Sequence, residues 1–231
     1  MAVITISRQY GSGGDEIAGL VCQNTGYRLF DKFMLARAAT EAGLSEDEII
    51  DYSEEHYKVK NFLSRLFGSS QTIAQRSVWK EDASGVRVAE QVQLTETAAV
   101  ALVRKAMEYA NWMGNTVIIG RGGQAILQDM PAVLHVRIEA PLEDRILRVR
   151  NDPRTVEQHL ATPVEVRRYA QTLIETRDAA SEDYLKRFYK VDWSDPALYH
   201  LVINTGKLTL EQAAGVIVEA IRLMEAVPVP A

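Results

Sequence analysis

The chain has 231 residues, 47% hydrophobic and 25% charged, a composition that excludes intrinsic disorder, collagen and coiled-coil arrays and predicts one globular domain. Its formal net charge of -5 disfavours a general nucleic-acid binder. The single cysteine, Cys22, excludes an internal disulfide and argues against a cysteine-based zinc site. Neither a secretory leader nor an apolar run of about 18 residues is visible, so we expect a cytoplasmic protein that does not bind membranes.

The first half of the chain is predicted to alternate strand and helix only at its start. Its predicted elements are a strand at 3–6, a glycine-rich loop at 11–14, a helix ending at Gly26, a short strand at 27–30, helices over 32–66, a loop over 67–85, an extended stretch over 86–94, and a long helix ending near Gly114. The strand at 27–30 ends at Asp31.

The second half returns to alternation. Its predicted elements are strands at 116–119, 133–138 and 201–203, a helix with Pro141 in its first turn, charged helices over 150–190, and a closing helix with a capping box at Thr209 and Gln212. Strands that alternate with helices predict a parallel α/β sheet, in which ligands bind beyond the carboxyl ends of the strands. Two helical stretches, 32–114 and 150–190, interrupt the alternation.

A glycine-rich loop, Gly11-Ser12-Gly13-Gly14, follows the first strand. Consecutive glycines let backbone N–H groups converge on a phosphate, and the following helix adds its positive end. Against the template GxxxxGK[ST], Gly14 occupies the lysine position, and Asp15 and Glu16 stand where a hydroxyl residue is expected. The loop therefore has two interpretations, a phosphate site or a tight turn between strand and helix.

A second loop, Gly120-Arg121-Gly122-Gly123, follows a buried strand. The planar guanidinium of Arg121 suits a phosphate, although a surface arginine is the plainer interpretation. Residues 145–187 hold a third basic feature, in which Arg145 and Arg148 share one helix face. An ion-paired helical surface explains most of the arginines in that segment.

Together these features resemble the cytidylate kinase-like branch of the P-loop nucleoside monophosphate kinases, along nearly the whole chain. The segments that carry the resemblance are Ile-Ser-Arg-Gln-Tyr-Gly-Ser-Gly-Gly (6–14), Phe-Asp-Lys (30–32), Val-Ile-Ile-Gly-Arg-Gly-Gly (117–123), Ala-Pro-Leu-Glu-Asp-Arg (140–145) and Asp-Trp-Ser-Asp-Pro-Ala-Leu-Tyr (192–199). The resemblance implies a P-loop NTPase-like parallel sheet flanked by helices. Its core would be residues 1–31, 115–149 and 191–231, with a helical monophosphate-binding insertion at 32–114 and a helical lid at 150–190.

The resemblance also implies roles for single residues. Gly11, Ser12, Gly13 and Gly14 would bind the donor phosphates. Asp31 and Arg121 would hold the acceptor. Arg145, Arg177 and Asp178 would act on the transferring group, with Ser181 in place of a further lid arginine.

Two cations expected in such a site are missing, the loop lysine and one lid arginine. Phosphoryl transfer depends on positioning and on positive charge. Arg8, just before the loop, is the candidate substitute for the lysine, and its alternative role is an ion pair with Asp15 or Glu16. Ser12, Asp15 and Glu16 are the candidate contacts for Mg²⁺.

Three functions follow from these observations. The first is an ATP- and Mg²⁺-dependent phosphotransferase acting on a nucleoside monophosphate or another small acceptor. The second is a catalytically weak or inactive nucleotide-binding regulatory protein, which the missing lysine and hydroxyl favour. The third is a scaffold of the same fold that binds no nucleotide and acts through a protein partner.

Overall fold

The computed structural model describes residues 1–30, 74–81, 87–94, 96–153 and 162–226. The chain divides into two compact units, one made of Met1–Asp31 and Met107–Ala231, the other of Lys32–Ala106. Asp31 and the predicted helices over 32–66 lie outside the described residues.

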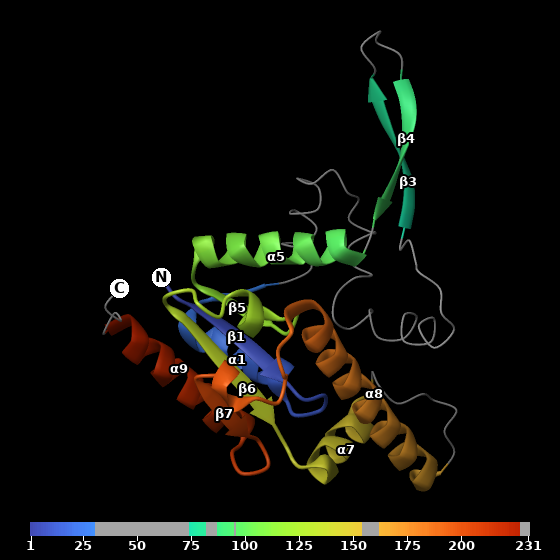
Figure 1. Ribbon diagram of the computed structural model, residues 1–231. Coiled ribbons are helices and arrows are strands. Elements are labelled where there is room, and N and C mark those ends of the chain that lie inside the picture. The colour runs from blue at the N-terminus through green and yellow to red at the C-terminus, as the bar shows by residue number, and fades with distance from the viewer. Residues whose placement is uncertain (31–73, 82–86, 95, 154–161, 227–231) are drawn as a thin grey trace. The chain divides into compact units, whose positions relative to one another are not determined.

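A five-stranded parallel sheet forms the centre of the first unit (Figure 1), with strand order β2-β5-β1-β6-β7. Its strands are β1 (Val3–Arg8), β2 (Arg28–Leu29), β5 (Thr116–Ile119), β6 (Val133–Glu139) and β7 (Leu201–Asn204). β1 is central, and its Val3–Ile6 segment pairs with Thr116–Ile119 of β5 on one side and continues along β6 on the other. The predicted α/β fold is confirmed.

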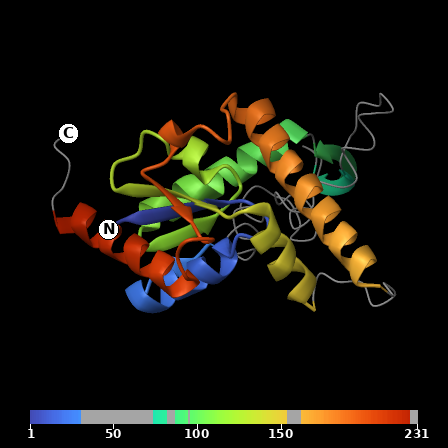
Figure 2. The same ribbon diagram turned by 90° about the horizontal axis from the view of Figure 1, so that it is seen from below.

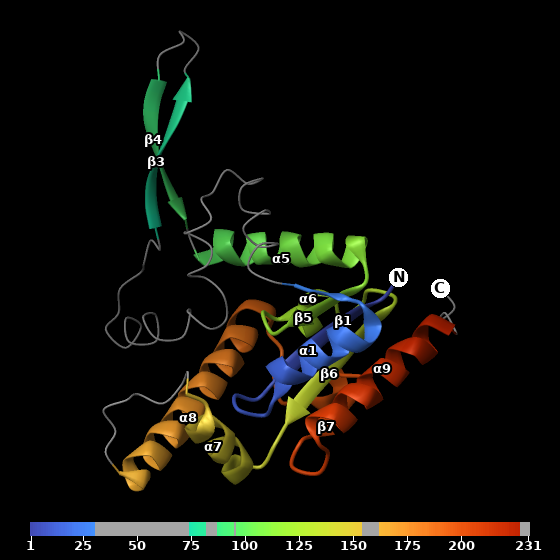
Figure 3. The same cartoon turned by 180° about the vertical axis from the view of Figure 1, so that it is seen from behind.

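Helices flank this sheet. They are α1 (Gly14–Thr25), α6 (Gly123–Ile126), α7 (Leu142–Asn151), α8 (Pro163–Tyr189), α9 (Leu210–Ala226) and a 3-10 turn at Pro196–Leu198, while α5 (Glu96–Met113) runs from the second unit into the first. Figure 3 shows α1 and α9 together on one face of the sheet. None of the helices in the described part of the chain has the length and apolar character needed to cross a bilayer.

The core between the sheet and these two helices is almost entirely aliphatic. Ile4 and Ile6 of β1 are fully buried, as are Ile17 of α1 and Ile217 of α9. Such side chains are each worth about 1.5–3 kcal/mol when removed from water. This packing fixes the start of α1, and with it the glycine-rich loop, at the carboxyl end of β1.

The second unit contains an antiparallel pair of strands, β3 (Ala74–Glu81) and β4 (Arg87–Leu94). β4 confirms the predicted extended stretch over 86–94. The predicted loop over 67–85 is wrong for residues 74–81. The sequence there is largely polar and has no apolar period, yet β4 supplies a hydrogen-bonding partner along the whole strand, from Ala74↔Leu94 to Glu81↔Arg87.

Local helix signals are mostly confirmed. Gly26 ends α1 in the left-handed conformation, with φ 72°. Thr209 and Gln212 form the predicted capping box, each backbone N–H bonded to the other side chain, at 3.0 and 3.2 Å. Pro141 is the N-cap of α7 and not a member of its first turn. Thr162 and Glu165 form a further capping box at the start of α8.

A buried histidine lies inside the sheet. His135 of β6 is 2% exposed, its Nδ1 lies 2.7 Å from the hydroxyl of Thr5, and its ring stacks on that of His200. Burial, and then the nearby His200, lower the pKa of His135 to about 4. The imidazole is therefore neutral at pH 7.

We predict that this histidine makes the protein sensitive to acid. The unfolded chain takes up a proton near pH 6.5, whereas the folded chain does so only near pH 4, so stability is lost as the pH falls through this interval. At pH 5 the loss is about 2 kcal/mol relative to pH 7. Urea unfolding at both pH values measures it, and His135→Gln is expected to remove most of the difference. An equal pH dependence in both proteins would contradict this assignment.

Candidate functional site

The two glycine-rich loops meet the same edge of the sheet. The first follows β1 and the second follows β5, and these strands are adjacent and parallel. Gly120 N–H donates to the carbonyl of Ile6 at 2.9 Å, which ties the start of the second loop to β1. The structure therefore brings residues 11–14 and Arg121 to the carboxyl ends of neighbouring strands.

The first loop has the backbone of a phosphate-binding turn. Gly11 and Gly13 have φ of 79° and 84°, a region that favours glycine. Gly13 is the N-cap of α1, and the first helical bond runs from Ile17 N–H to Gly13 O at 3.0 Å. The N–H groups of Gly14, Asp15 and Glu16 precede that bond, so they are donors at the positive end of the helix.

The packing of Arg8 against Gly14 explains why position 14 does not hold the lysine of the GxxxxGK[ST] template. A Cβ at Gly14 would lie 2.6 Å from the Cβ of Arg8 and 2.7 Å from its Cγ. These distances are far shorter than any real contact, so a lysine at 14 and an arginine at 8 exclude each other. The Arg8 side chain occupies the space over the start of α1.

The guanidinium of Arg8 donates from Nε to Asp15 Oδ1 at 2.9 Å. The ion pair considered for Arg8 is thus present, with its side chain 14% exposed and that of Asp15 61% exposed. This pair holds a cation beside the loop and engages one oxygen, Oδ1, of the Asp15 carboxylate.

The candidate metal contacts lie at the same place but do not form a cluster. Ser12 is fully buried, and its hydroxyl has no hydrogen-bond partner among the described residues. Asp15 is engaged by Arg8, and Glu16 is exposed. Within the described residues no group of three or more His, Cys, Asp and Glu side chains is gathered as for a metal ion.

The predicted lid residues converge on Tyr10, at the start of the loop. Asp178 Oδ1 accepts the backbone N–H of Tyr10 at 2.8 Å, and its Oδ2 accepts from Arg145 Nη1 at 2.5 Å. The guanidinium of Arg177 lies over the ring of Tyr10, 5.5 Å from its centroid. Arg145, Arg177 and Asp178 therefore lie together beside Tyr10, and in this state they contact one another and the loop.

Helix α8, which carries Arg177 and Asp178, packs along α7 (Figure 2). Ile146 and Val149 of α7 meet Ala170 and Ile174 of α8 in a small buried cluster, which Tyr10 joins. Ser181 is 4% exposed, and its hydroxyl donates to the carbonyl of Arg177 at 3.2 Å. A buried position of this kind suits serine better than the large, charged arginine of the family pattern.

Two residues outside the loop donate hydrogen bonds to its carbonyls, and neither of them was given a role by the sequence. Arg148 of α7 donates from Nη1 to Gly11 O at 3.4 Å and to Thr205 Oγ1 at 2.9 Å, and from Nη2 to Thr205 O at 2.8 Å. Thr205, directly after β7, donates to Ser12 O at 2.7 Å. Two features of the sequence could have identified these residues. Arg148 shares a helix face with Arg145, and Thr205 follows the carboxyl end of a strand.

Arg121 takes a left-handed backbone conformation, with φ 57°. Its guanidinium lies over the ring of the buried Phe30, 5.2 Å from the centroid. The following Gly122 is confined, because a Cβ there would lie 2.9 Å from the ring of Tyr189. The Arg121 guanidinium thus lies against Phe30, at the end of β2, while its expected companion Asp31 lies outside the described residues.

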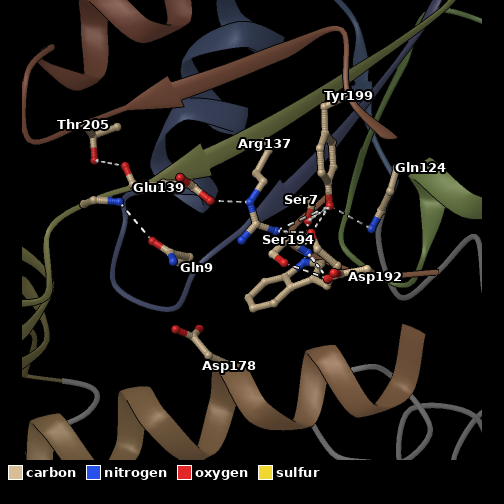
Figure 4. Close-up of polar contacts among 12 residues, drawn as sticks. Ser7, Gln9, Gln124, Arg137, Glu139, Asp178, Asp192, Ser194, Tyr199 and Thr205 are labelled. Atoms are coloured by element: carbon tan, nitrogen blue, oxygen red, sulfur yellow. Dashed lines mark hydrogen bonds and ion pairs between the residues drawn. The ribbon is translucent and has the colours of Figure 1, made fainter. Parts of the chain in front are cut away.

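The segment 192–199 binds a buried arginine behind the loop (Figure 4). Arg137 of β6 is 3% exposed, donates to Trp193 O at 2.6 Å, and pairs with Glu139 at 2.5 Å. Its guanidinium lies over the rings of Trp193 and Tyr199. The indole N–H of Trp193 donates to Ser7 Oγ at 2.8 Å. This bond links the cluster to β1, at the residue that precedes Arg8.

The strand order, the glycine turn at the start of α1 and the cations around it define the protein as an α/β protein with a P-loop kinase fold. The model of the cytidylate kinase-like family matches residues 3–207, and the chain belongs to that family. No curated protein matches it.

One solved structure shares this fold, and two others are weaker matches. An uncharacterised protein from Eubacterium ventriosum is similar over 96% of this chain and 99% of its own, with a TM-score of 0.60 and 18% identity. Shikimate kinases from Acinetobacter baumannii and Bacteroides thetaiotaomicron match with TM-scores of 0.45 and 0.46 and 12% identity, covering 96% and 97% of this chain and 94% and 97% of theirs. The family and the fold together support a nucleotide kinase-like function.

Proposed function

We propose that the protein is an ATP-dependent phosphotransferase that acts on a nucleoside monophosphate or a similar small phosphorylated acceptor. The observation that carries the proposal is the pairing of the Gly11–Gly14 turn with Arg8. Converging N–H groups at a helix N-terminus suit a phosphate chain, and Arg8, whose Cβ and Cγ fill the space of a side chain at position 14, would supply the charge of the missing lysine. The buried hydroxyl of Ser12, which has no partner among the described residues, fits a ligand at the same turn.

ATP with Mg²⁺ would supply the γ-phosphoryl group, whose phosphorus bonds an acceptor phosphate oxygen as its bond to the bridging oxygen breaks and ADP leaves with the electron pair. The chain's own part is positioning and charge. The Gly11–Gly14 turn and Arg8 hold the donor phosphates, and Arg121 holds the acceptor. Arg145 and Arg177 lie beside the loop and would turn from Asp178 and Tyr10 toward the transferring group. Ser12 and Glu16 would be the oxygen donors for the metal, since Asp15 accepts from Arg8 through Oδ1.

The proposal assigns Arg8 to the donor phosphates and Arg121 to the acceptor, and replacing each arginine separately tests it. Charge-assisted hydrogen bonds to phosphate are worth about 1.5–3 kcal/mol each, so Arg8→Ala is expected to weaken ATP binding by about one to two decades and to spare monophosphate binding. Arg121→Ala is expected to do the reverse. Calorimetry with ATP and with a panel of monophosphates measures both, and coupled ADP release measures turnover. Arg222→Ala, which removes an exposed charge on α9, is the matched control.

Equal small effects from both arginines would overturn this assignment. A second function, a nucleotide-binding regulator without turnover, is favoured by the engagement of Arg145 and Asp178 with each other. Binding of ATP without ADP release would support that second function. If the protein binds no nucleotide at all, the third function remains, a scaffold of the same fold that acts through a protein partner.

A further inference from the structure

Three successive backbone carbonyls, those of Tyr10, Gly11 and Ser12, each accept a hydrogen bond from a side chain outside the loop. Arg145 Nη1 donates to Tyr10 O at 3.4 Å, Arg148 Nη1 to Gly11 O at 3.4 Å, and Thr205 Oγ1 to Ser12 O at 2.7 Å. The donors come from one face of α7 and from the end of β7. We call this arrangement the carbonyl clamp.

The clamp determines where the loop's N–H groups point. In a trans peptide the C=O and the next residue's N–H point in opposite directions, and every described peptide bond here is trans. Holding the Ser12 carbonyl toward Thr205 therefore turns the Gly13 N–H away from Thr205. Holding the Tyr10 carbonyl toward α7 does the same for the Gly11 N–H. The Ser12 N–H is already bonded to Gln9 O at 3.1 Å.

Thr205 is the central member of the clamp. It is 4% exposed, its hydroxyl accepts from Arg148 Nη1 at 2.9 Å, and its own proton goes to Ser12 O, the nearer of two carbonyls, with Glu139 O at 3.3 Å. Its backbone N–H donates to Glu139 O at 2.8 Å and its carbonyl accepts from Arg148. Every polar atom of Thr205 is thus committed, and the shorter distance to Ser12 O favours that carbonyl over Glu139 O as the acceptor of the hydroxyl proton.

We propose that Thr205 and Arg148 are positioning residues of the phosphate-binding turn, which orient the Gly13 N–H toward the donor phosphate before the nucleotide binds. This inference rests on the proposed function for its ligand, but the orientation of the empty loop is a property that can be measured without one. A loop ordered in advance loses less conformational freedom on binding, so the clamp raises affinity without touching the nucleotide.

The test uses the full chain and compares Thr205→Val, which keeps the shape and loses the hydroxyl, with Thr205→Ser, which keeps the hydroxyl. In the absence of nucleotide, Thr205→Val is expected to speed amide exchange in the peptide covering residues 9–16 by about tenfold, the effect of one hydrogen bond. The Kd for ATP, measured by calorimetry, is expected to rise by about the same factor. Thr205→Ser restores both values.

Thr209→Val is the matched control. Thr209 is exposed and caps α9, so its loss lowers stability without freeing a loop carbonyl, and exchange over 9–16 should stay at the wild-type rate. Arg148→Met provides a second variant should Thr205→Val not fold. Unchanged exchange over 9–16 in the variants that fold would overturn the inference. If the wild type binds no ATP, the proposed function fails, while the exchange data still decide the clamp.

Discussion

Lysine introduced at position 14 is expected to destabilise the protein by about 3 kcal/mol and to weaken donor binding, although it restores the residue of the GxxxxGK[ST] template. The new Cβ would lie 2.6 Å from the Cβ of Arg8, an atom fixed to the central strand that cannot move away by rotation. Gly14 does not lie in the left-handed region, so the cost comes from this overlap and not from backbone strain. Chemical denaturation of the two proteins measures it.

The overlap also predicts which second change relieves it. Arg8→Gly removes both colliding carbons, so Arg8→Gly with Gly14→Lys should recover about 2 kcal/mol relative to additivity, whereas Arg8→Ala keeps the Cβ and should recover little. Gly19→Lys on the same helix is the control, because no atom lies within 4 Å of a Cβ there. It should be neutral or slightly stabilising. Wild-type stability in Gly14→Lys would show that Arg8 does not fill this space.

Asp178→Ala is expected to lower the free energy of unfolding by about 4 kcal/mol. The substitution leaves the guanidinium of Arg145, 8% exposed, without its carboxylate, and also frees the N–H of Tyr10. An uncompensated buried charge is among the costliest changes in a protein interior. Thermal and urea unfolding measure the loss, and exchange over residues 9–16 shows whether the loop loosens with it.

The matched control lies between the same two helices. Arg167 of α8 pairs with Glu143 of α7 at 2.6 Å, but their side chains are 47% and 70% exposed, so Arg167→Ala should cost at most about 1 kcal/mol. Replacing both partners of the buried pair, as in Arg145→Met with Asp178→Leu, should recover much of the stability lost in Asp178→Ala. Equal costs for Asp178→Ala and Arg167→Ala would show that the Arg145 pair is effectively solvated.

Most of the strands and helices of the first unit could be predicted because their signals are local. Apolar runs such as 116–119 and 133–138, glycine at Gly26 and the capping box at Thr209 each act within a few residues. β3 could not be predicted in this way, since its sequence is polar and its stability as a strand comes from pairing with β4. Pairing with β4, and not the residue pattern of 74–81, makes this segment a strand.

The sequence named candidate site residues but not the contacts between them. The family resemblance implied roles for the loop and for the pair at 177 and 178, and the structure places Asp178 and Arg177 against Tyr10. The sequence did not predict which of these residues are hydrogen-bonded to each other. The bond from Tyr10 to Asp178 spans 168 residues, and that from Thr205 to Ser12 spans 193. Contacts between such distant residues depend on how α7, α8 and β7 pack, which no short motif encodes.

Trp193 gives the chain a built-in optical reporter. Its indole is 6% exposed, stacks with the Arg137 guanidinium 4.4 Å from the ring centroid, and donates to Ser7, whereas Trp112 is 75% exposed. Indole emission depends on polarity and on nearby charge, so the two side chains should fluoresce at different wavelengths. With Trp79 and Trp112 replaced by phenylalanine, the remaining emission would come from a residue bonded to the strand that carries Arg8. Ligand binding at the turn could then be followed in real time without attaching a dye.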